Sequence, residues 1–335
     1  MSTEKPTSVP LSKSPTRLPR ARVIVDNDFA GDPDDLFQLA HHLLSPSVEI
    51  PFIISSRLPA TPPEAQTGSV DRGVAVVNTL LDRMGLEVPV LRGSEQDRTG
   101  SAPVRSEASD AILAEALRDD TDLPLYLVLG GGLTELANAY LTDPAIAHRL
   151  TAVWIGGAGY SEVEPTEPGV FGAEYNMDID VPSAQVVFGS PVTLWQVPVD
   201  SYRRCLVSWT ELRERVSSLG GFGAHLVGAL DEFADLVGTY GGLNLGETYA
   251  LGDSPLVLLT ALQSAFDPDP TSSESEYVSR RSITDSGWYG PSQPDLPPVR
   301  VFSRLDTRLM FEDMYAKFAL HARTGLQPST PQESR

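Results

Sequence analysis

The chain has 335 residues, enough for one large α/β domain or two smaller ones. Its 45 Asp and Glu residues outnumber 25 Lys and Arg residues, giving a formal net charge of −20. Because such a surface repels phosphate backbones and anionic lipid, we expect neither nucleic acid nor membrane as a partner. Cys205 is the only cysteine, which excludes an internal disulfide and fits a reducing cytoplasm.

The composition at the two ends differs from that of the middle. Residues 1–21 are rich in Pro, Ser and basic residues and lack the apolar segment of a secretory signal, and residues 326–335 are similarly polar. No linker or repeat divides the stretch between them. We therefore predict one domain over residues 22–325, flanked by disordered tails at 1–21 and 326–335.

Apolar runs of strand length alternate with helical patterns through this domain. The expected strands are 22–26, 50–56, 89–92, 123–129, 152–156, 192–197 and 299–302. The expected helices are 34–44, 73–84, 108–117, 133–141, 183–188, 209–219, 222–240 and 255–265. This order predicts an α/β fold with a mostly parallel central sheet and helices on both of its faces.

A cluster of aspartates follows the first predicted strand. The sequence DNDFAGDPDD places five carboxylates within ten residues, on Asp26, Asp28, Asp32, Asp34 and Asp35. Ligands bind at the carboxyl edge of such sheets, and crowded carboxylates repel one another unless a cation or a shared proton neutralises them. A hard divalent cation, Ca²⁺ first, is the simplest answer. The alternative is that Asp34 or Asp35 merely caps the following helix.

Three later segments place polar or glycine residues directly after apolar runs. A glycine turn begins at Gly130, and a second follows Ile155. Residues 173–180 alternate polar and apolar residues, which predicts a strand or loop with one polar side. Asp253 precedes a helix and is either a site residue or a plain N-cap. We interpret residues 266–298 as a long loop over the sheet edge, or as an idle surface insertion.

In this order the segments resemble the inosine–uridine-type nucleoside hydrolases. The opening DNDFAGDPDD is similar to the family's Asp-x-Asp-Pro-Gly-x-Asp-Asp signature, with a longer loop. LVLGGGLTELANAYLTDPAIAHRLTAVWIGGAG, AEYNMDIDVPSAQVVF and GDSPLVLLTAL resemble later family blocks, and VRVFSRLDTRLMFEDMYAKFA resembles the terminal strand and helix. Together they span residues 22–325. The resemblance implies a Rossmann-like, nucleoside hydrolase fold.

The resemblance also assigns roles to residues. It implies that Asp28 is the base that activates a calcium-bound water, with Asp26 as support behind it. The implied Ca²⁺ ligands are Asp28, Asp35, the carbonyl of Gly130, and Asp253. The implied substrate residues are Asp34, Ile155, Glu174, Asn176 and Asp253, of which all but Ile155 hold the ribose hydroxyls.

The implied reaction is Ca²⁺-dependent hydrolysis of the N-glycosidic bond of a ribonucleoside, giving free base and ribose. The residue types agree with it, because a Ca²⁺ shell takes six to eight oxygens and a carboxylate can accept a proton from water. Carboxylates also stabilise an oxocarbenium-like centre. The implied partner is a small-molecule nucleoside, and the implied assembly is a homodimer or homotetramer.

Several positions depart from the family pattern. In the longer loop, Asp32 is able to replace Asp34 or Asp35 around the ion. The family's histidine before the late aspartate, which protonates the leaving base in one subgroup, is Gly252 here, and its asparagine after the second strand is missing.

These departures leave the leaving-group acid unassigned. His225 fits a helix surface or a core better than a site, so we predict that Tyr240, Trp288 or Tyr289 helps the base to leave by stacking or through a hydroxyl. Such stacking favours purine nucleosides, or a substrate with a good leaving group, over uridine.

Two other classes of protein compete with this interpretation. A Ca²⁺- and ribose-binding pseudoenzyme is consistent with the lost histidine. A haloacid-dehalogenase-like phosphatase also places Asp-x-Asp at a strand end, but it requires a lysine in a phosphate site, and lysine is scarce in this chain.

Overall fold

The computed structural model describes residues 19–60, 67–96, 102–160, 173–242, 244–266 and 271–325. The tail predicted at 326–335 and all but the last three residues of the tail predicted at 1–21 lie outside the described residues.

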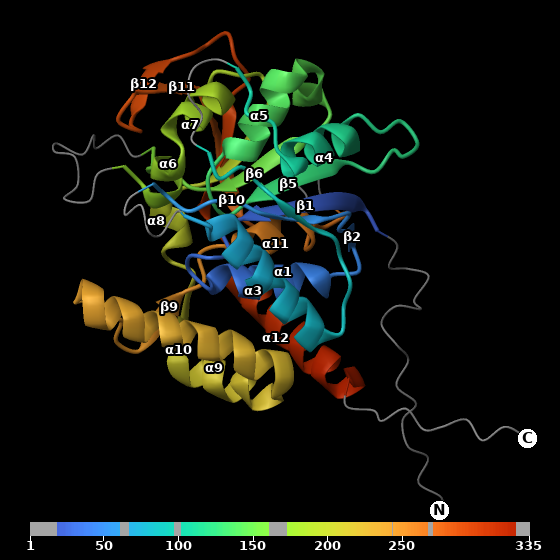
Figure 1. Cartoon of the computed structure of the whole chain (residues 1–335), viewed down its shortest axis with the longest axis vertical. Helices are drawn as coiled ribbons and strands as arrows, with labels where there is room; N and C mark the ends of the chain where they lie inside the picture. The colour runs from blue at the N-terminus through green and yellow to red at the C-terminus, as the bar shows by residue number, and fades with distance from the viewer. Residues whose placement is uncertain are drawn as a thin grey trace, which may run out of the picture.

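One sheet organises the molecule (Figure 1). Within the described residues it has nine strands in the order β10-β13-β7-β6-β5-β1-β3-β4, with β2 also paired to β1. Its strands are β1 (Ala21–Asn27), β2 (Val48–Glu49), β3 (Ile53–Ser55), β4 (Val90–Arg92), β5 (Leu125–Leu129), β6 (Thr151–Ile155), β7 (Thr193–Val197), β10 (Glu274–Val278) and β13 (Val299–Arg304). Every pairing is parallel except that of β10 with β13. The predicted parallel sheet and all seven predicted strands are confirmed.

Helices cover both faces of the sheet, as predicted (Figure 1). One face carries α1 (Asp34–Leu43), α3 (Ser69–Met84), α9 (Trp209–Arg215), α10 (Gly221–Gly241), α11 (Pro255–Thr260) and α12 (Thr307–Gly325). The other carries α4 (Glu107–Ala116), α5 (Thr134–Thr142) and α7 (Val181–Phe188). Short elements complete the chain: α6 (Tyr175–Ile179), α8 (Val199–Tyr202), η2 (Pro144–His148), η3 (Ser217–Leu219) and the antiparallel pair β8 (Leu206–Ser208) and β9 (Thr248–Ala250).

The sheet separates two hydrophobic cores. In β1, Val23 and Val25 pack in the core beneath α1 and α3, whereas Ile24 packs in the core beneath α4 and α5. Successive strand residues point to opposite faces, so a strand buried on both sides is a continuous apolar run in sequence. Among the described residues, no helix combines the length and hydropathy needed to cross a bilayer.

Two predictions of local structure are wrong. Residues 173–180 contain the helix α6, because the Glu174 side chain caps it by accepting the Met177 N–H. Residues 266–298 are more than a loop: they contain the edge strand β10 and the hairpin of β11 (Arg281–Ile283) and β12 (Tyr289–Ser292). The β10 strand is mostly exposed and contains Glu274 and Glu276, which is typical of an edge strand, so it lacks the apolar run that predicts a buried strand.

Candidate active site

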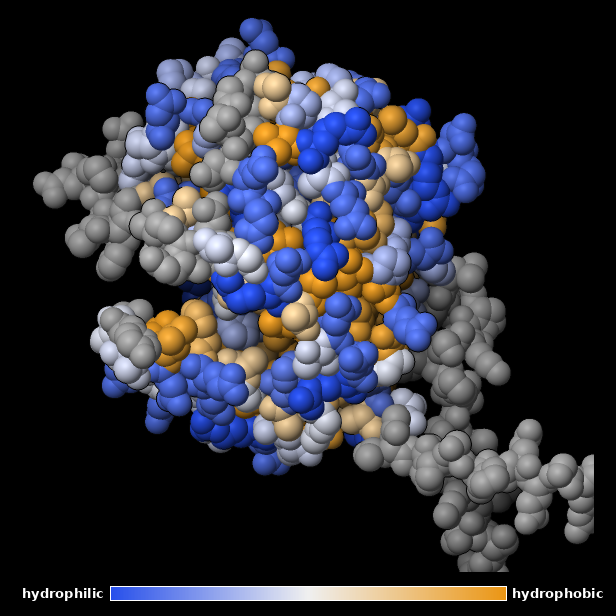
Figure 2. Space-filling view, viewed as in Figure 1, coloured by the Kyte–Doolittle hydropathy of each residue, from blue (hydrophilic) through white to orange (hydrophobic). Residues whose placement is uncertain are grey.

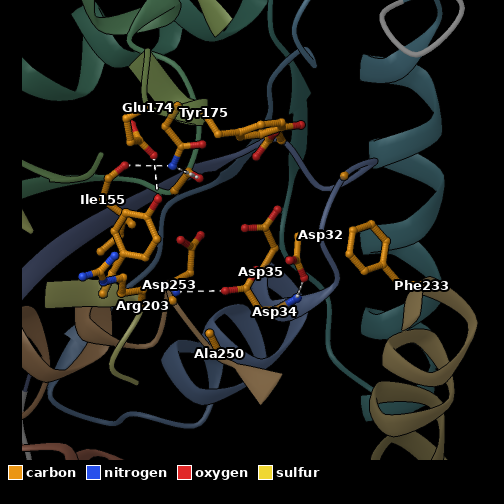
Figure 3. A pocket seen from close by; sticks show the side chains of 16 residues that line it. Asp32, Asp34, Asp35, Ile155, Glu174, Tyr175, Arg203, Phe233, Ala250 and Asp253 are labelled. Carbon is orange, nitrogen blue, oxygen red and sulfur yellow. Dashed lines mark hydrogen bonds between the residues drawn. The ribbon is translucent and has the colours of Figure 1, made fainter. Parts of the chain in front are cut away.

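A cavity of about 340 Å³ opens at the carboxyl ends of the parallel strands (Figure 3). Its lining comprises Asp28, Gly31, Asp32, Asp34, Asp35, Gly130, Ile155, Glu174, Tyr175, Asn176, Tyr202, Arg203, Phe233, Ala250, Gly252 and Asp253. This set includes every residue expected to bind the ion or the ribose. In the space-filling view the surface is notched above α10, one of the helices that line the cavity (Figure 2).

Asn27, at the end of β1, links two of the carboxylates. Its side-chain Nδ2 donates to Asp35 Oδ1 and to Asp253 Oδ2, both at 2.9 Å, and its Oδ1 accepts the Gly130 N–H at 3.1 Å. One buried amide thus ties the starts of two helices, α1 and α11, to the end of β5. Sequence reasoning gave Asn27 no role, although its place between two aspartates at a strand end was a signal.

Gly130 is required where β5 ends, because there is no space for a side chain. A Cβ atom at this position would lie 1.8 Å from Asp253 Oδ2. The Gly130 carbonyl accepts from Asn176 Nδ2 at 3.0 Å, and the same amide donates to the Ile155 carbonyl at 2.9 Å. Asn176 therefore joins α6 to the ends of β5 and β6.

Several acidic oxygens in the cavity suit a hard cation. Asp28 Oδ2 and Asp35 Oδ2 are buried and have no hydrogen-bond partner among the described residues. Burial raises the pKa of Asp28 to about 7. It also raises the pKa of Asp35 and of Asp253, and the charges of neighbouring aspartates add to both shifts. No three His, Cys or acidic side chains in the described part of the chain form a ready-made metal group. The donor chemistry fits Ca²⁺, because a hard cation bound by carboxylate oxygens would neutralise these buried, partnerless groups.

The capping alternatives for these aspartates are wrong. The N-cap of α1 is Pro33, with no side-chain cap bond, and that of α11 is Ser254. Asp34 Oδ2 instead accepts the Asp253 N–H at 3.1 Å.

Asp32 does not displace Asp34 or Asp35 from the cavity. It lies beside them and accepts from the Tyr249 hydroxyl at 2.6 Å.

Glu174 is held by three donors. Its Oε2 accepts the N–H groups of Gly157 at 2.7 Å and Met177 at 3.1 Å, and its Oε1 accepts from the Tyr202 hydroxyl at 2.7 Å. Burial raises the pKa of Glu174, and burial together with this carboxylate raises that of Tyr202. Tyr202 therefore remains protonated and acts as a hydrogen-bond donor.

The ring of Tyr202 also packs closely against Gly252. A Cβ atom at Gly252 would lie 3.1 Å from Tyr202 Cδ2 and 3.4 Å from Asp34 Oδ2. A larger side chain, such as the histidine of the family pattern, would press against the tyrosine ring. Sequence reasoning missed Tyr202, because nothing in the chain links it to Gly252 or Glu174.

Trp288 and Tyr289 are not among the residues that line the cavity. The Tyr289 hydroxyl donates to the Ala158 carbonyl at 3.0 Å, and its ring stacks on Tyr160 at a centroid distance of 4.7 Å. Trp288 lies in the β11–β12 turn, where its backbone N–H donates to the side chain of Thr284. The geometry therefore does not support a role for either side chain in the departure of the base. The side chain of Tyr240, the third residue named for this role, lies outside the described part of the structure.

Other aromatic residues take their place around the cavity. Tyr175 from α6, Tyr202 from α8 and Phe233 from α10 all line it. The Tyr175 ring reaches over the side of the cavity that holds Asp32 (Figure 3). Its side chain is 52% exposed, so one ring face is available to a ligand. Phe233 was missed because its apolar position on an amphipathic helix looks like any core residue.

Comparisons with known proteins identify the family and the fold. The family model for inosine-uridine preferring nucleoside hydrolase matches residues 23–279. No curated protein matches the chain. Solved structures share its fold: a purine-preferring ribonucleoside hydrolase from Gardnerella vaginalis (19% identity, TM-score 0.70), an inosine-guanosine nucleoside hydrolase (18%, 0.66) and a plant nucleoside hydrolase (17%, 0.65). Each comparison covers 90% of this chain and 99% of the other. The chain therefore belongs to the inosine-uridine preferring nucleoside hydrolase family, a class of N-glycosyl hydrolases.

Proposed function

We propose that the protein hydrolyses the N-glycosidic bond of a ribonucleoside, in a Ca²⁺-dependent reaction that releases free base and ribose. The observation that carries this proposal is the meeting of Asp28, Asp35, Gly130 and Asp253 in one cavity, with buried carboxylate oxygens that have no hydrogen-bond partner among the described residues. These groups come from three separate segments of the chain. Their convergence explains why the fold keeps so many acids at one edge of the sheet.

The ion would be held by the carboxylates of Asp28, Asp35 and Asp253 and by the Gly130 carbonyl. When bound, Ca²⁺ supplies positive charge that makes a nearby water more acidic and that attracts a vicinal diol. The same charge offsets the repulsion among the carboxylates.

The chain's own residues then carry the reaction. Asp28 accepts a proton from the attacking water, whose oxygen forms the new bond to the ribose C1′. The C1′–N bond breaks, and its electron pair leaves with the base. The carboxylates stabilise the positive charge that develops on the ribose. Asp34, Glu174 and Asn176 would hold the ribose hydroxyls, and Ile155 would pack against the sugar.

The base would lie among the aromatic side chains. Tyr175 and Phe233 offer ring faces, and a purine has more surface to stack than a pyrimidine. Two proteins of the same fold are described as purine-preferring and as inosine-guanosine hydrolases. We therefore propose purine ribonucleosides as the preferred substrates.

A second candidate function rests on a specific observation. Among the described residues that line the cavity there is no histidine, and the position of the family's histidine is Gly252. A Ca²⁺- and ribose-binding protein without turnover would have such a cavity.

One assay separates the two candidates. Inosine, guanosine, uridine and p-nitrophenyl riboside are incubated with the protein and Ca²⁺, and free base or phenol and ribose are measured. We expect release from all four, fastest for p-nitrophenyl riboside and faster for the purine nucleosides than for uridine. Binding of inosine without release of its base would favour the second candidate. Neither binding nor release would contradict both candidate functions.

A homodimer or homotetramer and a cytoplasmic location remain predictions. Sedimentation analysis tests the oligomeric state, and fractionation of cells tests the location.

A further inference from the structure

A second cavity, of about 420 Å³, adjoins the active site between the start of α1, α3 and α10. Gly31 and Phe233 line both cavities, so the two meet at these residues. We call the second cavity the α3–α10 groove. Its apolar lining is continuous and includes Phe29, Leu36, Val76, Ala229 and Leu236. Leu236 is 52% exposed, which leaves apolar surface uncovered at the opening of an enzyme cavity.

The groove also contains a histidine that the fold does not use. His225, on α10, lines the groove, and its buried Nε2 makes no hydrogen bond within the described residues. Burial and the nearby Arg83 charge lower the pKa of His225, so its ring is neutral near pH 7. The remaining polar lining residues are Arg72 and Glu232. The groove is therefore an apolar channel with a few polar groups, which is the usual composition of a small-molecule site.

The α3–α10 groove lies on the Phe233 side of the active-site cavity. Glu174 and Phe233 lie on opposite sides of the aspartate cluster (Figure 3). If Glu174 holds the ribose, the base extends away from it, toward Phe233. A substituent on the side of the base farthest from the ribose then enters the α3–α10 groove.

We propose that the α3–α10 groove extends the base subsite and accepts a large, mainly apolar substituent on the nucleobase. The preferred substrate class is then a ribonucleoside with a substituted base. This inference rests on the proposed function for the position of the ribose, but the groove can be tested by binding alone.

The test compares two ligands that differ only in the substituent. Calorimetry measures the Kd of adenosine and of N6-(2-phenylethyl)adenosine, in the presence of Ca²⁺ and with the Asp28→Asn variant so that no ligand is consumed. We expect the substituted nucleoside to bind about tenfold more tightly or better, because the groove removes an aromatic ring from water. Similar Kd values for the two ligands would overturn the inference.

Two substitutions in the groove check that the difference arises there. Ala229→Trp fills the groove and Leu236→Ser removes apolar surface at a half-exposed position that folding tolerates. Both should reduce the ratio of the two Kd values toward one and leave adenosine binding within about twofold of its original value. The matched control is Ala224→Trp, an exposed alanine on the same helix. An unchanged ratio in both groove variants would overturn the inference.

Failure of the proposed function can be distinguished from failure of the groove inference. If the unmodified protein releases no base from either ligand but the Kd ratio holds and falls in the groove variants, the groove inference stands and the protein is a binding protein. If adenosine is hydrolysed but the Kd ratio is near one, the proposed function stands and the groove inference is wrong.

Discussion

The two ends of the cavity differ in how their residues are held. At the carboxylate end, Asp28, Asp35 and Asp253 are buried at strand and helix ends, and the Asn27 amide connects Asp35 to Asp253. At the aromatic end, Tyr175 is half exposed and Phe233 projects from the long helix α10. The carboxylate end belongs to the edge of the sheet, whereas the residues of the aromatic end come from the separate helices α6 and α10.

This difference indicates a division of labour. Chemistry on the ribose requires fixed oxygens, which the carboxyl edge of a parallel sheet provides for many enzymes. Recognition of the leaving group requires only surface of suitable shape, which separate helices can supply in different ways. We therefore expect substitutions at the carboxylate end to abolish turnover and substitutions at the aromatic end to change the choice of base.

The largest effect is expected at the carboxylate end. Asp28→Ala removes the proposed base and should lower kcat by a factor of about 10² or more. The variant should remain folded, because it removes one charge from a repelling cluster. Asp178→Ala, an exposed aspartate on α6, is the matched control. Near-normal turnover by Asp28→Ala, measured with inosine, would contradict the assignment.

Tyr202→Phe tests the connection between the two ends. The variant keeps the ring next to Gly252 but loses the 2.7 Å hydrogen bond to Glu174. Because bonds to charged groups contribute more than neutral ones, we expect kcat/KM for inosine to fall by about tenfold. Tyr175→Phe removes a hydroxyl elsewhere in the cavity and serves as the control. Equal losses in the two variants would show that the bond to Glu174 has no special role.

Calcium should stabilise the carboxylate end in a pH-dependent way. An unfolded aspartate loses its proton near pH 3.8, whereas Asp28 in the folded protein loses it near 7. Between these values the ion-free folded state binds more protons than the unfolded state. The stabilisation that comes from protonated Asp28 is therefore fully present below about pH 4 and is lost as the pH rises through 7. Ca²⁺ binds the deprotonated form, so millimolar Ca²⁺ should raise Tm by several degrees at pH 8 and by less at pH 5. An equal gain at both pH values, measured by calorimetry, would contradict a carboxylate site.

The smallest effect is expected outside the cavity. Trp288→Ala should leave the kcat/KM ratio of inosine to uridine within about twofold of its original value, because Trp288 lies in the β11–β12 turn and does not line the cavity. Phe233→Ala should change the same ratio, since Phe233 lines the cavity at the proposed base subsite. A larger effect of Trp288→Ala than of Phe233→Ala would reverse our assignment of the aromatic end.

The sequence predicted the carboxylate end better than the aromatic end, for physical reasons. Strands buried on both faces are long apolar runs, and the residues that follow them, such as Asp28 and Gly130, are found by position alone. Phe233 and Tyr202 come from helices whose apolar residues fit a core equally well, so only the folded arrangement shows that they reach the cavity. The sequence predicts a long loop around Trp288 and Tyr289, whereas in the structure these residues belong to the β11–β12 hairpin and Tyr289 packs on Tyr160.

The central claim is that the buried carboxylates form a Ca²⁺ site on which hydrolysis depends. Release of hypoxanthine from inosine is measured in protein treated with a calcium chelator, and then again after stepwise addition of Ca²⁺. Our account predicts loss of activity with the chelator and its recovery on addition of Ca²⁺, with no recovery in Asp28→Ala or Asp253→Ala. Full activity in the calcium-free protein would contradict it.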